Sequence, residues 1–188
     1  MDIRIETPRL ILREHTAEDL LTHHALLSDA RAMYYLPEVK TAALDASRAN
    51  LDEAIAAAQA QPREKYFLRM ELRATHAHIG EIGYTVIRAE PGRKVVNLGY
   101  FTHPAYWSNG YVTEAVHALL AFAFATDGVT LVETGCIREN VGSERVMQKC
   151  GMARDAAYSE TQLHDGREKE RVRYTITAEE WNALHKHV

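Results

Sequence analysis

Hydrophobic residues recur along the chain with two spacings, the about 3.6-residue period of a helix and the two-residue period of a strand. The helical spacing predicts helices at 17–28, 45–61, from 107–116 to about 126, at 139–151 and at 177–187. The alternating spacing predicts strands at 9–13, 65–73, 78–88, 95–102 and 130–136, and two more that flank Asp165-Gly166 as a hairpin. This order of elements predicts an α/β (α+β) fold in a single domain, residues 1–188.

Two of the predicted helices begin with the sequence signature of a capping box. Thr16 is followed three residues later by Asp19, and Thr177 is followed three residues later by Glu180. In this signature the side chains of the two residues satisfy backbone N–H groups that the helix leaves without a partner. We therefore expect helices to start close to Thr16 and Thr177.

Composition and charge exclude several classes of protein. The 188 residues carry a formal net charge of −4, which provides no basic field for nucleic acid. The two cysteines, Cys136 and Cys150, do not form a disulfide framework. The N-terminal sequence lacks the features of a signal peptide, and no apolar run reaches the roughly 18 residues of a membrane span. We expect a cytoplasmic protein that binds neither nucleic acid nor membrane.

The segment WSNGYVTEAV, 107–116, joins a predicted strand to a predicted helix through small polar residues. The first N–H groups of a helix have no acceptor within the helix, and the helix dipole places partial positive charge there. Small residues allow these groups to approach phosphate oxygens. The segment has neither a GK[ST] sequence nor GxGxxG, so nucleoside triphosphates and dinucleotides are poorly supported. The alternative is a helix start that binds nothing.

Five segments together resemble the GNAT acyltransferase superfamily, and more closely its branch of ribosomal-protein N-acetyltransferases. They are TPRLILR, LGYF, HPAYWSNGYVTEAV, ENVGSERVMQKCGM and HDGREKERVRYTIT, in the order of that branch, and they cover about residues 7–177. The resemblance implies a mixed, mostly antiparallel central sheet of about six to seven strands flanked by helices. It also implies that the sheet splays in its middle to admit acetyl-CoA.

The resemblance further implies acetyl-CoA as co-substrate, with no metal, and assigns its contacts. The backbone N–H of Tyr100 would donate a hydrogen bond to the thioester oxygen, and Asn140 would both cap its helix and bind the pantetheine arm. An extended strand can pair with the amides of that arm. The residues implied in cofactor binding are Phe101, Thr102, His103, Ser108, Asn109, Gly110, Tyr111, Val112, Thr113 and Asn140.

Three positions depart from the family pattern. Ser108 replaces a glycine of the phosphate loop, and Val112 replaces glycine or alanine. Met147 occupies the place where many members have a tyrosine general acid. Ser143 matches a serine of the ribosomal branch, and a hydroxyl there can donate a hydrogen bond to the leaving thiolate. Its alternative is an ordinary serine in the first turn of a helix.

The acceptor amine must lose a proton before it can attack, so we searched for a base. Glu133 is our choice because it lies on the strand beside the expected splay. Glu81, Glu160 and His103 are alternatives, and each of the four can also be an ordinary solvated side chain.

An α-amine, with a pKa of about 8, is neutral at pH 7 to a larger extent than a lysine of pKa about 10.4. This favours a protein N-terminus or a small amine as acceptor. The alternatives are a polyamine, an antibiotic or an amino-acid-like metabolite, or a catalytically inactive protein that binds acyl-CoA. Family members are often homodimers, which makes a homodimer one option here.

Ten histidines raise the question of a metal site. The pairs His23/His24, His76/His78 and His185/His187 lack the third and fourth ligands of a zinc motif. We interpret the histidines as surface residues.

Overall fold

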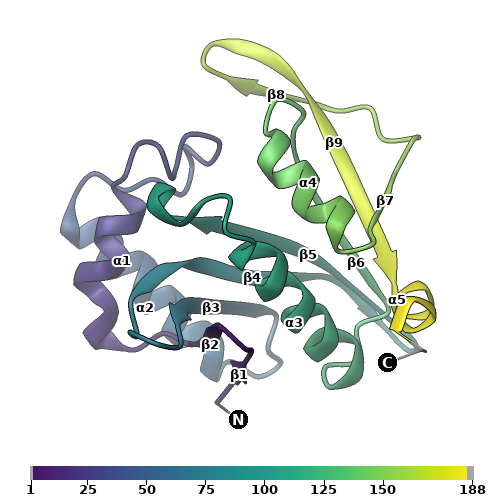
Figure 1. The fold of residues 1–188 in the computed structure, drawn as a ribbon, viewed down its shortest axis with the longest axis horizontal. Coiled ribbons are helices and arrows are strands. Elements are labelled where there is room, and N and C mark those ends of the chain that lie inside the picture. Colours follow the sequence, from purple (N-terminus) through teal and green to yellow (C-terminus); the bar gives the residue numbers. More distant parts are fainter. Residues whose placement is uncertain (1, 186–188) are drawn as a thin grey trace. The chain divides into compact units, whose positions relative to one another are not determined.

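The computed structural model describes residues 2–185. The chain forms two compact units. Unit 1 comprises the chain up to Thr85 together with Gly99–Leu119, and unit 2 comprises Val86–Leu98 and the chain from Leu120 onward. Two strands and one helix have residues in both units, so each unit is described separately (Figure 1).

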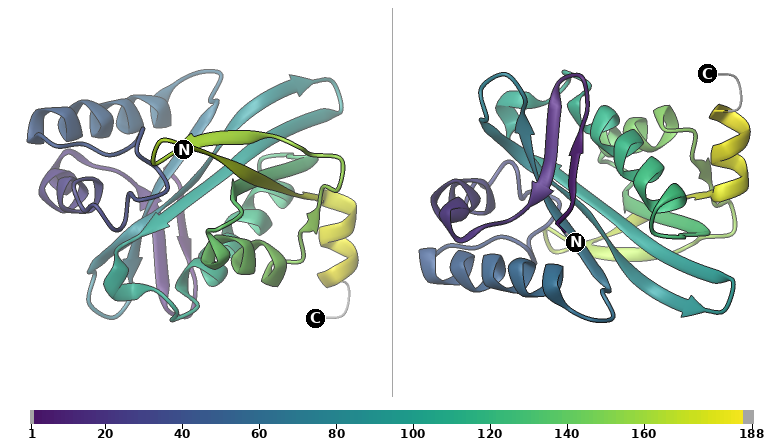
Figure 2. Two further views of the ribbon diagram at one scale, coloured as in Figure 1. Left: turned by 90° about the horizontal axis from the view of Figure 1, so that it is seen from above. Right: turned by 90° about the horizontal axis from the view of Figure 1, so that it is seen from below.

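Unit 1 is built on strands in the order β1-β2-β3-β4-β5. The strands are β1 (Arg4–Glu6), β2 (Leu10–Glu14), β3 (Lys65–Leu72), the first part of β4 (His78–Glu90) and the last part of β5 (Arg93–Thr102). Its helices are η1 (Ala17–Asp19), α1 (Leu20–Leu27), α2 (Leu44–Gln59), η2 (Pro104–Tyr106) and the start of α3 (Tyr111–Ala125). Helices α1 and α2 lie side by side (Figure 2).

Strand β3 in the middle of this sheet is buried on both faces. Its alternating residues Tyr66, Leu68 and Met70 are buried as their spacing predicts. The intervening Arg69 and Glu71 are also buried, at 5% and 4% exposure. One face of β3 therefore contributes to an apolar core, and the other face holds charges away from water.

Unit 2 has strands in the order β4-β5-β6-β9-β7, with β8 paired to β9. Its further elements are β6 (Leu131–Ile137), α4 (Val141–Lys149), β7 (Ala153–Arg154), β8 (Thr161–His164), β9 (Arg167–Thr177) and α5 (Ala178–His185). Strand β6 is parallel to β5 and antiparallel to β9. Asp165 and Gly166, with φ of +50° and +71°, form the tight turn between β8 and β9, as predicted.

The fold class is confirmed as a mixed, largely antiparallel open sheet flanked by helices. The described residues contain nine strands in place of the expected six to seven. The extra strands β1 and β7 have three and two residues, too few to show a period in the sequence. The single-domain prediction stays a prediction.

The two predicted capping boxes lie where helices begin. The Asp19 carboxylate accepts the backbone N–H of Thr16 at 2.8 Å, and the segment starts as a 3-10 turn before it becomes α1. Thr177 and Glu180 accept each other's backbone N–H groups at 2.8 Å and 3.1 Å. The expected extension of this helix to residue 187 lies partly outside the described residues.

Across residues 2–185, none of the helices combines the length and the apolar character needed to cross a membrane.

Candidate active site

The loop between β5 and α3 in unit 1 has an unusual backbone. Ser108 and Gly110 both have left-handed φ angles, +62° and +77°. The position where the family usually has glycine therefore keeps the conformation that glycine adopts, even though it carries a serine side chain. The Trp107 indole N–H donates to the Thr102 carbonyl at 3.1 Å, which fixes the start of the loop against the end of β5.

The same loop leads directly into the first turn of α3. The first i to i−4 hydrogen bond runs from the Glu114 N–H to the Gly110 carbonyl at 3.1 Å. The N–H groups of Tyr111 and Val112 precede this bond, so the helix itself supplies no acceptor for them. Partial positive charge at this end favours an anion.

Arg9, immediately before β2, holds this helix end in place. Its backbone N–H and its Nε donate to the Glu114 carboxylate at 2.9 Å and 2.6 Å, and its Nη1 donates to the Asn109 carbonyl at 3.0 Å. The Thr7 hydroxyl donates to the same carboxylate at 2.6 Å. Burial acts to raise the pKa of Glu114, but the hydrogen bonds from Thr7 and Arg9 outweigh it and lower that pKa.

The end of β5, with Tyr100, Phe101 and Thr102, is held close to β4. A β-carbon at Gly80 would lie 2.4 Å from the Phe101 carbonyl oxygen, so only glycine fits at this point of β4. The next residue, His103, donates its backbone N–H to the Ile79 carbonyl at 2.9 Å. Burial lowers the pKa of the His103 imidazole, which keeps the ring neutral at pH 7.

In unit 2, the predicted residues Asn140 and Ser143 lie at the start of α4. Asn140 caps the helix, because its Oδ1 accepts the Ser143 backbone N–H at 3.2 Å. The Cys136 thiol on β6 donates to the Asn140 carbonyl at 3.8 Å, and the Ser143 hydroxyl lies near the same thiol. Burial raises the pKa of that thiol, and the nearby Ser143 hydroxyl offsets only part of the effect. Two residues of the resembled motif, Asn140 and Ser143, thus share one small region of unit 2 with Cys136.

Glu133 lies on β6, half buried, opposite Asn97 of β5 and Thr175 of β9. The described pairing of β5 with β6 covers Val95–Asn97 and Leu131–Glu133. Immediately beyond it, the Leu98 carbonyl accepts a hydrogen bond at 2.8 Å from the side chain of Thr134. The Leu98 carbonyl is therefore bound by a side chain and not by a backbone N–H of β6. Glu133 is the last residue of β6 that pairs with β5.

Met147, at the family's usual tyrosine position, is buried in α4 with 1% exposure. A different phenol lies beside the same helix. The Tyr174 hydroxyl, from β9, donates to the Glu144 carboxylate at 2.8 Å and accepts from the Gln148 amide at 3.1 Å. Burial, and the Glu144 carboxylate as acceptor, raise the pKa of Tyr174.

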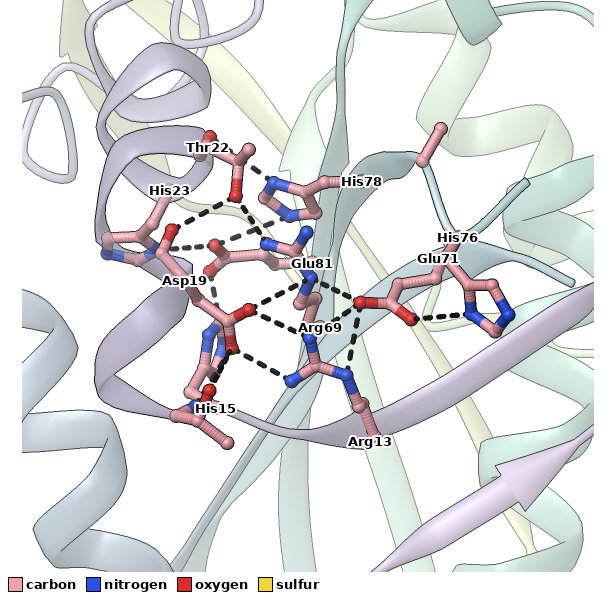
Figure 3. Close-up of polar contacts among 12 residues, drawn as sticks. Arg13, His15, Asp19, Thr22, His23, Arg69, Glu71, His76, His78 and Glu81 are labelled. Carbon is pink, nitrogen blue, oxygen red and sulfur yellow. Dashed lines mark hydrogen bonds and ion pairs between the residues drawn. The ribbon is translucent and has the colours of Figure 1, made fainter.

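Unit 1 also contains a buried polar cluster that the sequence interpretation missed (Figure 3). The register aligns Arg13 of β2 with Arg69 of β3, and Arg69 with Glu81 of β4, so these three side chains share one face. Residues from the following helical segment and the neighbouring strands complete the cluster, namely His15, Asp19, His23, Glu71 and His78.

The ion pairs of this cluster are short. Arg13 donates to both Asp19 oxygens at 2.8 Å and to Glu71 at 2.6 Å, and Arg69 Nε donates to Glu71 at 2.7 Å. Burial acts to raise the pKa of Asp19, but the hydrogen bonds from Arg13 and from the Thr16 N–H hold it well below its usual range. Two arginines thus balance two carboxylates inside the unit.

Our interpretation of the histidines as surface residues is wrong for four of them. His15, His23, His78 and His164 are buried, with exposures of 6%, 0%, 8% and 4%. Two features of the sequence could have indicated burial. His78 lies in a predicted strand, and His15 and His23 lie just before and within a predicted helix. His187 lies outside the described residues.

Comparison with known proteins agrees with this fold. A family model described as an acetyltransferase (GNAT) domain matches residues 9–153. The chain belongs to the GNAT family of N-acetyltransferases, enzymes that acetylate an amine.

Relatives cover the chain almost completely. The uncharacterized N-acetyltransferase YnaD of Bacillus subtilis strain 168 is 29% identical over 180 residues, which are 96% of this chain and 100% of YnaD. Ribosomal-protein-S5-alanine acetyltransferase from Vibrio fischeri superposes with a TM-score of 0.81 at 15% identity, over 96% of this chain and 99% of that chain.

Spermidine N-acetyltransferase from Vibrio cholerae, solved in complex with CoA and spermine, superposes with a TM-score of 0.78 at 16% identity. The match covers 93% of this chain and 99% of that one. At these identities, the two solved structures are evidence for the fold.

Proposed function

We propose that this N-acetyltransferase takes its acetyl group from acetyl-CoA and that the loop Ser108–Thr113 binds the pyrophosphate. The observation that carries the proposal is the left-handed backbone at Ser108 and Gly110 directly before the first turn of α3. That backbone leaves the N-terminal end of a helix approachable by an anion.

The residues around the loop fit an anionic ligand. A β-carbon placed on Gly110 would meet only one atom within 4 Å, the Arg9 Nη2 at 3.5 Å, so the glycine leaves open space. The Arg9 guanidinium lies 4.7 Å from the centre of the Tyr111 ring and adds positive charge beside the first turn. Ser108 and Val112 differ from the family pattern in their side chains but retain their backbone N–H groups.

When bound, acetyl-CoA supplies an acetyl thioester that an amine can attack. In this proposal the Tyr100 backbone N–H donates to the carbonyl oxygen, a kind of contact whose loss typically costs about 10²–10³ in rate. Phe101, Thr102 and His103 continue the strand end that pairs with the pantetheine amides. Asn140 caps α4, and the family resemblance assigns it to pantetheine binding.

In this proposal the Ser143 hydroxyl donates a hydrogen bond to the sulfur of the departing CoA. A thiol with a pKa of about 8.5 leaves without full protonation, so a hydrogen bond from the serine hydroxyl suffices. The nearby Cys136 thiol is only a weak hydrogen-bonding group, so it competes little with a thiolate for the serine hydroxyl.

Glu133 remains the proposed base. Glu81 is a poor candidate, because the hydrogen bond from His23 and the neighbouring histidines lower its pKa even though burial acts to raise it. A carboxylate that is buried, paired and weakly basic has little capacity to take a proton from an amine. His103 is the second candidate, since burial keeps its imidazole neutral and able to accept a proton.

For the acceptor we propose a protein N-terminal α-amine. Its ordinary pKa of about 8 leaves more of it neutral at pH 7 than a lysine or polyamine amine with a pKa near 10.4. The ribosomal-protein acetyltransferase of Vibrio fischeri supports this class. A polyamine is the second candidate, favoured by the fold shared with the spermidine N-acetyltransferase.

The test is a thiol-release assay with acetyl-CoA and three acceptors: a peptide with a free N-terminus and no lysine, a peptide with a blocked N-terminus and one lysine, and spermidine. We expect turnover of the first peptide alone, with a rate that rises between about pH 7 and 8.5 as the α-amine deprotonates. Turnover of spermidine alone would replace the proposed acceptor by a polyamine.

The phosphate loop is tested separately by equilibrium binding of CoA to a matched pair of variants. Gly110→Val and Gly92→Val each place a β-branched residue at a left-handed position, with φ of +77° and +74°. We expect similar losses of stability, because the backbone strain is the same. Only Gly110→Val should weaken CoA binding, and equal CoA affinity in both variants would argue against this loop.

A cytoplasmic location, expected from the sequence, remains a prediction that accompanies this function, and a homodimer remains the option that the family resemblance offers.

A further inference from the structure

Three buried side chains of unit 1 converge from three different elements. His15 follows β2, His23 lies on α1 and Glu81 lies on β4, and one ligand atom from each lies within 4.8 Å of the others (Figure 3). His23 Nδ1 is 2.6 Å from Glu81 Oε1, and His15 Nε2 is 3.8 Å from Glu81 Oε2. Among the residues that the structure describes, no other group of histidine, cysteine and carboxylate side chains has this arrangement.

His15 is a buried polar side chain without a hydrogen-bond partner in this cluster. Its side chain is 1% exposed, and neither ring nitrogen has a hydrogen-bond partner. The separation of 3.8 Å from Glu81 is too long for a hydrogen bond. Leaving a buried polar group without a partner is costly, and such a group in a native structure calls for an explanation such as an ion.

The hydrogen bond between His23 and Asn50 fits metal ligation by His23. The His23 Nε2 is 3.0 Å from the Asn50 Oδ1 on α2. If Nε2 carries the proton and donates it to this oxygen, Nδ1 has a free lone pair that points toward Glu81. Metal-bound histidines commonly donate their second ring N–H in this way. Without a cation, the 2.6 Å contact of Nδ1 with the carboxylate requires a proton between them.

The charges around the cluster leave one carboxylate for a cation. Asp19 and Glu71 accept hydrogen bonds from Arg13 and Arg69, so two positive and two negative side chains balance. Glu81 is outside these arginine pairs and faces histidines.

His78 is not a ligand, although it also approaches Glu81. Its Nε2 lies 3.0 Å from the Gly80 carbonyl and its Nδ1 lies 3.3 Å from the Thr22 carbonyl. Both nitrogens thus face backbone acceptors, which leaves two imidazoles and one carboxylate as the donor set.

We propose that His15, His23 and Glu81 bind one divalent cation of the zinc class, which ties the segment after β2 and helix α1 to strand β4. Two imidazoles and a carboxylate suit zinc and its first-row neighbours, whereas magnesium and calcium prefer oxygen ligands. Zinc–nitrogen bonds of about 2.0–2.1 Å in a tetrahedron place ligand atoms about 3.4 Å apart. The contact of 2.6 Å would widen and that of 3.8 Å would shorten, each by less than an ångström.

The test uses the full chain, stripped of metal with a chelator and titrated with Co²⁺, whose visible d–d bands report tetrahedral nitrogen and oxygen ligation, and with Zn²⁺ by calorimetry. We expect one equivalent of either ion to bind. His15→Leu and Glu81→Gln should weaken Co²⁺ binding at least about 100-fold. Asn50→Ala, which removes the acceptor of the His23 Nε2–H, should weaken it about 10- to 100-fold.

The control is His76→Asn, which removes an exposed histidine outside the three ligands, at a left-handed position that asparagine tolerates. It should bind one equivalent like the wild type. A wild type that binds neither ion stoichiometrically, or a His15→Leu variant that binds as tightly as the wild type, would overturn the proposal.

Thermal melts separate loss of a ligand from loss of the fold. Because both His15 nitrogens lack partners, metal-free His15→Leu should melt at or above the temperature of metal-free wild type. Zn²⁺ should raise the melting temperature of the wild type and leave that of His15→Leu unchanged. An equal rise in melting temperature in both proteins would show that zinc binds elsewhere and would contradict the assignment. If His15→Leu does not fold, the Co²⁺ affinity of Asn50→Ala provides the test.

Discussion

Arg9 and Glu114 are 105 residues apart in the chain, and their side chains form an ion pair of 2.6 Å that joins the residue before β2 to the first turn of α3. The same arginine donates to the Asn109 carbonyl in the loop proposed to bind the pyrophosphate. The position of this loop therefore depends on a residue near the N-terminus.

Replacing Arg9 should affect ligand binding more than stability. The Arg9 side chain is 47% exposed, and exposed ion pairs contribute about 0–1 kcal/mol, so Arg9→Ala should unfold close to the wild type. Its CoA dissociation constant should rise about tenfold, which corresponds to about 1.4 kcal/mol. Calorimetric titration with CoA measures this, with Arg4→Ala, whose ion pair with Glu6 is also exposed, as control.

The left-handed serine of the loop predicts a stabilising substitution. Ser108 has φ of +62°, which an L-residue adopts at a cost, so Ser108→Gly should raise the free energy of unfolding by about 0.5–1 kcal/mol. Ser28 has φ of −86°, where glycine brings only its entropic cost, and Ser28→Gly should lower stability. Denaturant unfolding of both variants measures the change in the free energy of unfolding. A change of the same sign in both would contradict the proposed backbone strain at Ser108.

Ser143→Ala tests the proposed hydrogen bond to the leaving thiolate. We expect kcat to fall about 10- to 100-fold, less than the 10²–10⁴ typical of general acid–base groups. The KM for acetyl-CoA should change little, since other contacts carry most of the binding. Steady-state kinetics measures both constants, with exposed Ser159→Ala as control. Full activity of Ser143→Ala would leave the serine with only a structural role.

Asn140→Ala should behave differently, because Asn140 caps α4 through the Ser143 N–H. Loss of the cap should cost about 1 kcal/mol of stability, and CoA affinity should fall as well. Asn140→Asp retains an acceptor oxygen and should recover the stability. Melting curves and CoA titrations of the two variants separate the effects, and an unchanged melting temperature in Asn140→Ala would show that the cap contributes nothing.

Acid should weaken unit 1 through Asp19. Because Arg13 and the Thr16 N–H hold the Asp19 pKa below its usual range, this carboxylate stabilises the fold above the unfolded pKa of about 3.9. That contribution is lost as the pH falls from about 4 toward the lower folded value. Asp19→Asn should flatten the pH dependence of unfolding below about pH 4.

At neutral pH, Asp19→Asn should lower stability by about 3–5 kcal/mol, since Arg13 and Arg69 lose a buried partner. Glu6→Gln, in an exposed ion pair, should change it by less than about 1 kcal/mol. Urea unfolding at a series of pH values measures both quantities. If the free energy of unfolding of Asp19→Asn falls with pH as steeply as that of the wild type, Asp19 does not cause the loss of stability in acid.

Local patterns were sufficient to predict most elements. The alternation Tyr66, Leu68, Met70 predicts a strand, and the pair Thr177 and Glu180 predicts a helix start, because each depends on neighbours in the sequence. The structure also keeps Asn140 at the helix cap that its residue type predicts. The resemblance to a family supplied what local patterns lack, the order in which the elements combine.

The buried polar cluster was not predictable from the same patterns. Arg69 and Glu71 fall on the face of β3 that an amphipathic strand would expose, and only the packing of unit 1 shows that this face is covered. Their partner Arg13 is far away in sequence, and its alignment with Arg69 depends on strand register. Periodicity identifies which residues share a face but not what lies against that face.

The buried charged face of β3 limits which substitutions this sequence can accept during evolution. Arg69, Glu71, Arg13 and Asp19 are bound to one another, so their substitution effects are coupled and do not add. A single neutral replacement leaves a charge stranded away from water, whereas a joint replacement by apolar residues can be tolerated. Homologous sequences should therefore retain these four residues together or exchange them as a set.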